Sequence, residues 1–533
     1  MSKKVKQIGY LTALVIITGG TIGSGIFLKN QSILSNSHND LMFAIISWIV
    51  SIVGIIAIGF ALIELSSSSK NDQGILTWVK NFTNSKIHKF SSSYMLLIYY
   101  PLTLLCLPIY VVASMDDVSI ASTGNVLFED DLWPTLIAIG IVSWLLFFSW
   151  VSLRIGEGIQ WAFTIIKFIP IVLLPIFAYI FASSGNTGDA LPSIPDGMNG
   201  LHPGLGIIAS IPAILFAFDG FFTITTLRSN LKNKKQMPWI MLVGLIIISL
   251  TYLYLSIAFA LPPNNGSSTG VKGMPQWLQI TLNVMIVSAV LGIVNGYCLS
   301  SNRLYIIAAE EKSFYLLSWI YKKFPRVSKK TASFLLLWIF LMIINVIMVP
   351  IAVYVWKPGS AATENSNVYL HLYAMADYLS NYTSLFAFVF IGLAIFGGIL
   401  NRKNKKTVVE KSKLFLPFAW ISIIFLSIGT LYFFIQPLVD IFLINDWDTR
   451  VTNITVLVIL FITLLISGIH AYVETKLAEK HGDSYLPKDY VYIESDIVEE
   501  IATNETIEDS SKNGENWLKS KGLSWLKGRK KNG

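Results

Sequence analysis

The sequence predicts an all-α polytopic membrane protein with about twelve transmembrane helices. Three observations predict this fold class: the composition, the recurrence of long apolar segments, and the alternating charge of the connections between them. The chain has 533 residues, of which 53% are hydrophobic and only 14% charged, and its mean hydropathy is +0.60. A water-soluble chain of this length carries more charge and usually divides into several domains. Burial in a bilayer explains this composition better.

Apolar segments of roughly 20 residues, enough to cross ~30 Å of hydrocarbon as a helix, recur along the chain. The first is predicted to remain as a helix and not to be a cleaved signal, because no A-x-A-like cleavage site follows it. We predict spans at approximately residues 8–28, 41–64, 92–115, 133–151, 158–182, 205–227, 237–262, 278–308, 333–356, 370–398, 414–436 and 451–475.

The connections between these spans alternate in basic content. The side opposite the basic connections holds only Lys29, Lys272, Lys357 and Arg450. By the positive-inside rule, the basic side and both termini are predicted to be cytoplasmic, in a protein of the cell membrane. This distribution explains the net charge of +8 without a nucleic-acid partner. The basic side holds Lys3, Lys4, Lys6, Lys70, Lys80, Lys86, Lys89, Arg154, Arg228, Lys232, Lys234, Lys235, Lys312, Lys322, Lys323, Arg326, Lys329, Lys330, Arg402, Lys403, Lys405, Lys406, Lys411 and Lys413.

The predicted organisation is a twelve-helix membrane domain (residues 1–475) followed by a polar tail (476–533) with a basic amphipathic end. Trp and Leu alternate with Lys near the end of this tail, which fits either contact with the anionic cytoplasmic leaflet or a solvated segment. No connection is long enough for a catalytic domain, so an enzyme is not expected. Two Cys and six His form no disulfide framework or metal-ligand cluster, and no metal or cofactor is predicted.

Glycine is unusually dense in the first span, with four glycines among the seven positions from Gly19 to Gly25. Each costs a helix roughly 1 kcal/mol relative to alanine. Backbone groups freed by a break in hydrocarbon need partners from protein, a cavity or a ligand. Unwound backbone offers N–H groups to an anion, and the N-terminus of a half-helix adds a favourable dipole. We therefore predict that this helix is broken and binds a substrate carboxylate.

The sixth span contains a second interruption at Asp219 and Gly220, within the apolar segment Phe216–Phe221. An ionised carboxylate at this depth is costly and usually functional. The two interruptions lie five helices apart, which is typical of inverted-repeat transporters. We predict two inverted five-helix repeats, 8–182 and 205–398, with discontinuous helices 1 and 6, followed by two additional helices within 414–475.

The glycines have two other interpretations besides a break. Close packing of the small-xxx-small kind is the structural alternative, but packing alone requires fewer glycines and no aspartate. A dinucleotide or phosphate loop is excluded, because no βαβ unit surrounds the glycines and no lysine completes a P-loop.

The chain resembles the amino acid–polyamine–organocation superfamily of transporters over roughly residues 8–475. The most specific match is Ile22–Phe27, with the sequence Ile-Gly-Ser-Gly-Ile-Phe. Arg154–Pro170 resembles the loop and fifth helix of the family, Asn295–Glu310 its eighth helix, and Phe216–Phe221 the sixth-helix pattern of some members.

The resemblance implies roles for the residues of the first break. Ser24 and Gly25 would bind the substrate carboxylate through a hydroxyl and a backbone N–H group. Ile22 and Gly23 would form the unwound backbone beside them.

It also implies roles for residues on other helices. Carbonyl groups near Thr21, Phe216 and Asp219 would receive the α-amino group, Phe216 would act as an aromatic gate, and Tyr297 would line the pocket. Lys167 matches a fifth-helix lysine that, in many proton-dependent or exchanging members, occupies the place of a sodium ion in sodium-coupled relatives.

Several interpretations of the two charged candidates stay open. Lys167 either extends its ammonium to the membrane surface, or is buried and loads and releases a proton, or is a fixed cation that replaces sodium. Asp219 either binds a cationic substrate side chain, or steadies the substrate ammonium or the broken helix, or stays protonated.

Together these features predict a secondary active amino acid transporter that works by alternating access, as a proton symporter or an amino acid exchanger, with cationic amino acids as the leading substrates. Its expected partners are the substrate, membrane lipids and protons; the sequence does not indicate an oligomeric state. The alternatives are a polyamine or other organic-solute transporter of the same fold, and a membrane sensor that binds amino acids without moving them.

Overall fold

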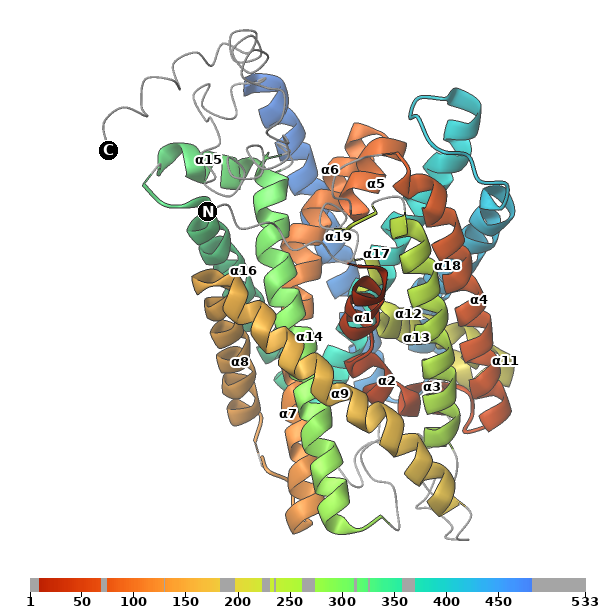
Figure 1. Ribbon diagram of the computed structural model, residues 1–533. Coiled ribbons are helices and arrows are strands. Elements are labelled where there is room, and N and C mark those ends of the chain that lie inside the picture. Colours follow the sequence, from red (N-terminus) through yellow and green to blue (C-terminus); the bar gives the residue numbers. More distant parts are fainter. Residues whose placement is uncertain are drawn as a thin grey trace. The chain divides into compact units, whose positions relative to one another are not determined.

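The computed structural model describes residues 9–68, 74–128, 130–182, 197–222, 231–233, 236–260, 274–310, 314–324, 326–356 and 370–481 (Figure 1). All of them belong to one compact unit, Ile8–Tyr485. Within these residues every secondary-structure element of more than one residue is a helix. The all-α fold class is therefore confirmed. The predicted tail lies outside the described residues, apart from its first few positions in the last helix.

The first half of the chain forms α1 (Tyr10–Thr21), α2 (Ser24–Leu28), α3 (Asn30–Asn36), α4 (Leu41–Ser66), α5 (Ile75–Phe82), α6 (Ser85–Tyr94), the π-helix η1 (Met95–Tyr99), α7 (Tyr100–Thr123), α8 (Leu132–Val151) and α9 (Leu153–Ala182). The second half forms α10 (Met198–Leu201), α11 (Pro203–Ala209), α12 (Ile211–Phe218), α13 (Met237–Ala260), α14 (Gln276–Glu310), α15 (Tyr315–Lys323), α16 (Lys329–Tyr354), α17 (Leu370–Asn404), α18 (Phe415–Leu443) and α19 (Trp447–His481).

Eleven helical stretches among the described residues are long and apolar enough to cross a membrane. They match eleven of the predicted spans. At the sixth position, 205–227, the structure has the shorter apolar stretch Pro203–Phe218, which ends at the predicted interruption. Residues 223–227 of that span lie outside the described part. The chain is thus a multi-pass membrane protein, and the regular helix in the described part of its sixth span ends at a break.

The centre of the structure is the continuous stretch formed by α6, η1 and α7. In its apolar segment 94% of the residues are buried, compared with 28% for α16. It packs against α14 and α17, and η1 packs against α17 as well. A π-helix is rare and often marks a functional site, because it shifts the faces that its residues present. Here it ends at Tyr99, which faces the broken helices.

One buried ion pair holds three helix ends together. The carboxylate of Glu64, near the end of α4, is only 2% exposed and accepts a hydrogen bond from the guanidinium of Arg402 on α17. It also accepts one from the backbone N–H of Ser412, just before α18, at 2.8 Å. These contacts fix the ends of α4 and α17 and the start of α18 on the predicted cytoplasmic side.

Candidate functional site

The first helix is broken where the glycines predicted. α1 ends at Thr21, Ile22 leaves the helical conformation (φ −69°, ψ 118°), and α2 begins at Ser24. The backbone of Ser24 is described, but its side chain is not. The discontinuity in helix 1 is therefore confirmed.

The sixth helix is broken at the predicted aspartate. α12 ends at Phe218, and Asp219 is extended (φ −61°, ψ 144°). Gly220 follows with φ 92°, in the left-handed region that only glycine adopts without strain. Residues 223–230 lie outside the described part. Both predicted interruptions thus occur, five spans apart.

Two side chains satisfy carbonyl groups that the breaks release. The ammonium of Lys167 on α9 is fully buried and donates to the carbonyls of Gly19 and Ile22, the latter at 2.9 Å. The hydroxyl of Tyr252 on α13 contacts carbonyls of both broken helices, Thr21 at 3.0 Å and Ala217 at 2.7 Å. An unpaired carbonyl in hydrocarbon costs several kcal/mol, so these donors help to make the breaks possible.

Glycine lets the two broken helices approach each other closely. A Cβ atom on Gly25 would lie 2.3 Å from the Cα atom of Ala217, which is far inside van der Waals contact. A Cβ on Gly23 would lie 1.6 Å from the side chain of Ile293 on α14. Gly25 therefore fixes the spacing between α2 and α12, and Gly23 leaves room for α14.

Asp219 is bound by the protein's own donors. One carboxylate oxygen accepts hydrogen bonds from the hydroxyls of Tyr99 (2.9 Å) and Ser384 on α17 (2.6 Å). The other accepts from the backbone N–H of Gly220 at 2.8 Å. The hydroxyl of Tyr297 on α14 lies 3.1 Å from that of Tyr99. This network joins η1, α14 and α17 to the second break at the end of α12.

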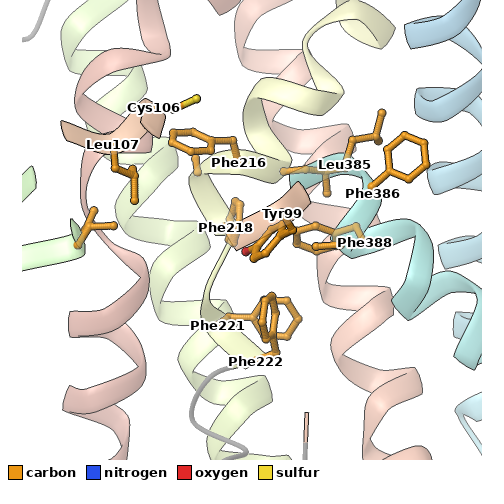
Figure 2. Close-up of a cluster of buried hydrophobic side chains, with 14 of the residues drawn as sticks. Tyr99, Cys106, Leu107, Phe216, Phe218, Phe221, Phe222, Leu385, Phe386 and Phe388 are labelled. Carbon is orange, nitrogen blue, oxygen red and sulfur yellow. The ribbon is translucent and has the colours of Figure 1, made fainter. Parts of the chain in front are cut away.

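A small cavity lies between the two breaks. Figure 2 shows Phe216 pointing towards Leu107 of α7, with Phe221 and Phe222 beyond the break in α12. The cavity volume is about 10 Å³, close to the space of a single water molecule. An amino acid fits only if the surrounding helices move apart. Its lining residues are Gly20, Thr21, Gly25, Leu107, Phe216, Asp219, Ile293 and Tyr297.

The structure brings most of the predicted site residues to this cavity. Thr21, Gly25, Phe216, Asp219 and Tyr297 line it directly. Ile22 and Gly23 form the adjacent break, and Lys167 holds that break through its carbonyl groups.

A buried ion pair beside the cavity was not predicted. Lys29, predicted to lie in a connection, is fully buried between α2 and α3. Its ammonium contacts the Asp377 carboxylate at 2.5 Å, the Tyr110 hydroxyl at 3.0 Å and the Ser380 hydroxyl at 2.9 Å. It also lies 4.7 Å from the ring centroid of Phe216. The available signal was Asp377, a carboxylate inside the predicted span 370–398.

The fold and this site define a helical membrane protein with a small cavity between two discontinuous helices. The chain belongs to the amino acid permease family, whose model matches residues 8–465. Members of this family move amino acids across membranes, so the chain is an amino acid transporter and not an enzyme.

Three relatives illustrate the similarity. An uncharacterized protein of Mycoplasma pneumoniae is 29% identical over 504 residues, which cover 85% of this chain and 88% of the relative. The serine/threonine exchanger SteT of Bacillus subtilis is 25% identical over 318 residues, covering 58% and 69%. The b(0,+)-type amino acid transporter 1 of Mus musculus is 24% identical over 455 residues, covering 82% and 83%.

Proposed function

We propose that the chain is an amino acid exchanger of the cell membrane that works by alternating access, with both termini in the cytoplasm. The observation that carries this proposal is the position of the cavity between two broken helices, which touch at Gly25 and Ala217. Exchange is favoured over proton symport because one of the relatives is named as an exchanger.

The proposed site holds the backbone of the substrate at the first break. The N–H groups of residues 23–25 and the Ser24 hydroxyl bind its carboxylate, because N–H groups at the start of a helix have no partner within the helix. Carbonyl groups near Thr21, Phe216 and Asp219 receive its α-amino group. Phe216 and Tyr297 then enclose the substrate from α12 and α14.

The contacts of Asp219 help to decide which amino acids the protein transports. Recognition of a cationic side chain requires this carboxylate to exchange the Tyr99 or Ser384 hydroxyl for the substrate. The cavity wall next to it is apolar, with Leu107, Phe216 and Ile293. We propose that neutral amino acids are the main substrates and that Asp219 steadies the second break. A preference for cationic amino acids is the competing proposal.

Uptake into proteoliposomes tests the function. Vesicles preloaded with an unlabelled amino acid should take up labelled neutral amino acids, and empty vesicles should take up at least tenfold less. Asp219→Asn should lower uptake of all substrates alike, because it weakens the network around the break. A selective loss of lysine and arginine uptake would instead support the cationic proposal. A sensor would show binding without uptake from either kind of vesicle.

Lys167 is proposed to act as a permanent cation that holds the first break. Lys167→Ala removes the donor to the Gly19 and Ile22 carbonyls, which costs on the order of 1–3 kcal/mol for each buried acceptor. We expect exchange to fall at least tenfold, and a pH gradient to leave exchange by the unmodified protein unchanged. Lys167→Arg is the control, because it keeps the charge without titrating. Uptake into empty vesicles that is driven by a pH gradient and lost in Lys167→Arg would establish proton symport instead.

A further inference from the structure

The short helix α15 connects α14 to α16 and has two different faces. Figure 1 shows it running across the ends of these helices, and it packs against both. Leu317, Ser318 and Tyr321 form its buried face. The Tyr321 hydroxyl lies 2.8 Å from the hydroxyl of Ser333 on α16. This contact holds the helix against α16 and leaves its opposite face outward.

The outward face carries large apolar side chains. Leu316 is 37% exposed, Trp319 40% and Phe324 49%. Leu316 and Trp319 are three residues apart and share one side of α15, and Phe324 directly follows the end of the helix. Exposed aromatic and aliphatic side chains at a helix end suit the boundary between headgroups and hydrocarbon.

Basic side chains accompany this apolar face. Lys322, Lys323 and Arg326 are all exposed. The ammonium of Lys323 lies 4.7 Å from the centroid of the Trp319 ring, which places a cation directly beside an interfacial aromatic. We call Leu316, Trp319, Lys322, Lys323, Phe324 and Arg326 the α15 platform.

We propose that the α15 platform binds anionic phospholipids of the cytoplasmic leaflet. The proposal rests on the orientation in the proposed function, in which α15 is cytoplasmic. Leu316, Trp319 and Phe324 alone would suit any lipid, whereas the three cations select a negatively charged headgroup. Each basic residue near an anionic surface strengthens binding roughly fivefold, so three of them distinguish anionic from zwitterionic lipid.

Lipid retention by the purified full-length protein tests this proposal without any substrate. The protein in neutral detergent is mixed with equal amounts of phosphatidylglycerol and phosphatidylcholine, and bound lipid is counted by native mass spectrometry. The test variant is Lys322→Gln/Lys323→Gln/Arg326→Gln. The matched control is Lys403→Gln/Lys405→Gln/Lys406→Gln, which removes the same charge from exposed residues in the last turn of α17 and directly after it.

The unmodified protein and the control should retain more phosphatidylglycerol than phosphatidylcholine, and the test variant should lose this preference by on the order of 100-fold. Equal retention by the test variant and the control would overturn the proposal. So would displacement of the lipid by soluble glycerol phosphate, which would identify a free phosphate site. If the triple variant does not fold, Lys323→Gln alone should lower the preference for phosphatidylglycerol several-fold. An unchanged preference in this single variant would contradict the proposal. Because no amino acid is present, the result is independent of whether the chain exchanges.

Discussion

Gly25→Ala is expected to reduce amino acid uptake by on the order of 100-fold, because misplacement of a binding group by about 1 Å has an effect of this size. The added Cβ atom would meet the backbone of Ala217 at 2.3 Å, and backbone cannot rotate away as a side chain can. α2 and α12 must therefore separate, and the cavity between them loses its shape. Labelled uptake into preloaded proteoliposomes measures this effect.

Gly140→Ala is the matched control, since a Cβ atom there would have nothing within 4 Å. It lies within α8, and we expect its uptake to equal that of the unmodified protein. Both variants should elute as a single folded species. Uptake by Gly25→Ala within twofold of the control would show that α2 and α12 need not be in contact.

Asp377→Ala is expected to destabilise the protein by about 3–5 kcal/mol, because it leaves the buried ammonium of Lys29 without its carboxylate. Its thermal unfolding temperature in detergent should fall by several degrees. Uptake should fall as well, since Lys29 lies between α2 and α3 and contacts Phe216 at the cavity.

A double variant separates the charge from the packing. Lys29→Met/Asp377→Leu removes both charges, and it should recover most of the stability that Asp377→Ala loses. Glu479→Ala is the control for an exposed pair, because Lys476 and Glu479 are 57% and 60% exposed. It should change the unfolding temperature little. If Asp377→Ala unfolds at the same temperature as this control, the Lys29–Asp377 pair does not stabilise the fold.

The breaks could be predicted because their causes are local in the sequence. Dense glycine from Gly19 to Gly25 and a carboxylate at Asp219 both contradict a continuous membrane helix. The structure places each break at that point. The positions of the spans could be predicted for the same reason. The mean hydropathy of about 20 consecutive residues is a local property of the sequence, and it identifies a spanning helix.

The partners of the breaks could not be predicted, because they come from distant parts of the chain. Lys29 and Asp377 are 348 positions apart, and Tyr252 is 231 positions from Thr21. The sequence position of a tyrosine in an apolar span does not indicate which distant carbonyl its hydroxyl will contact. The π-helix η1 could not be predicted either, because Met95–Tyr99 has the composition of an ordinary apolar α-helix. Only its hydrogen bonds, from residue i to residue i+5, distinguish it.

The hydroxyl of Tyr252 has a mechanical consequence. It joins the last carbonyl of α1 to one near the end of α12, beside the point where Gly25 rests on Ala217. Because the Tyr252 hydroxyl and the Gly25–Ala217 contact both link the two broken helices, these helices move together and do not slide past each other. In the proposed alternating-access cycle, the site is then exposed to either side by rotation of this joined pair against α14 and α17, which pack beside it.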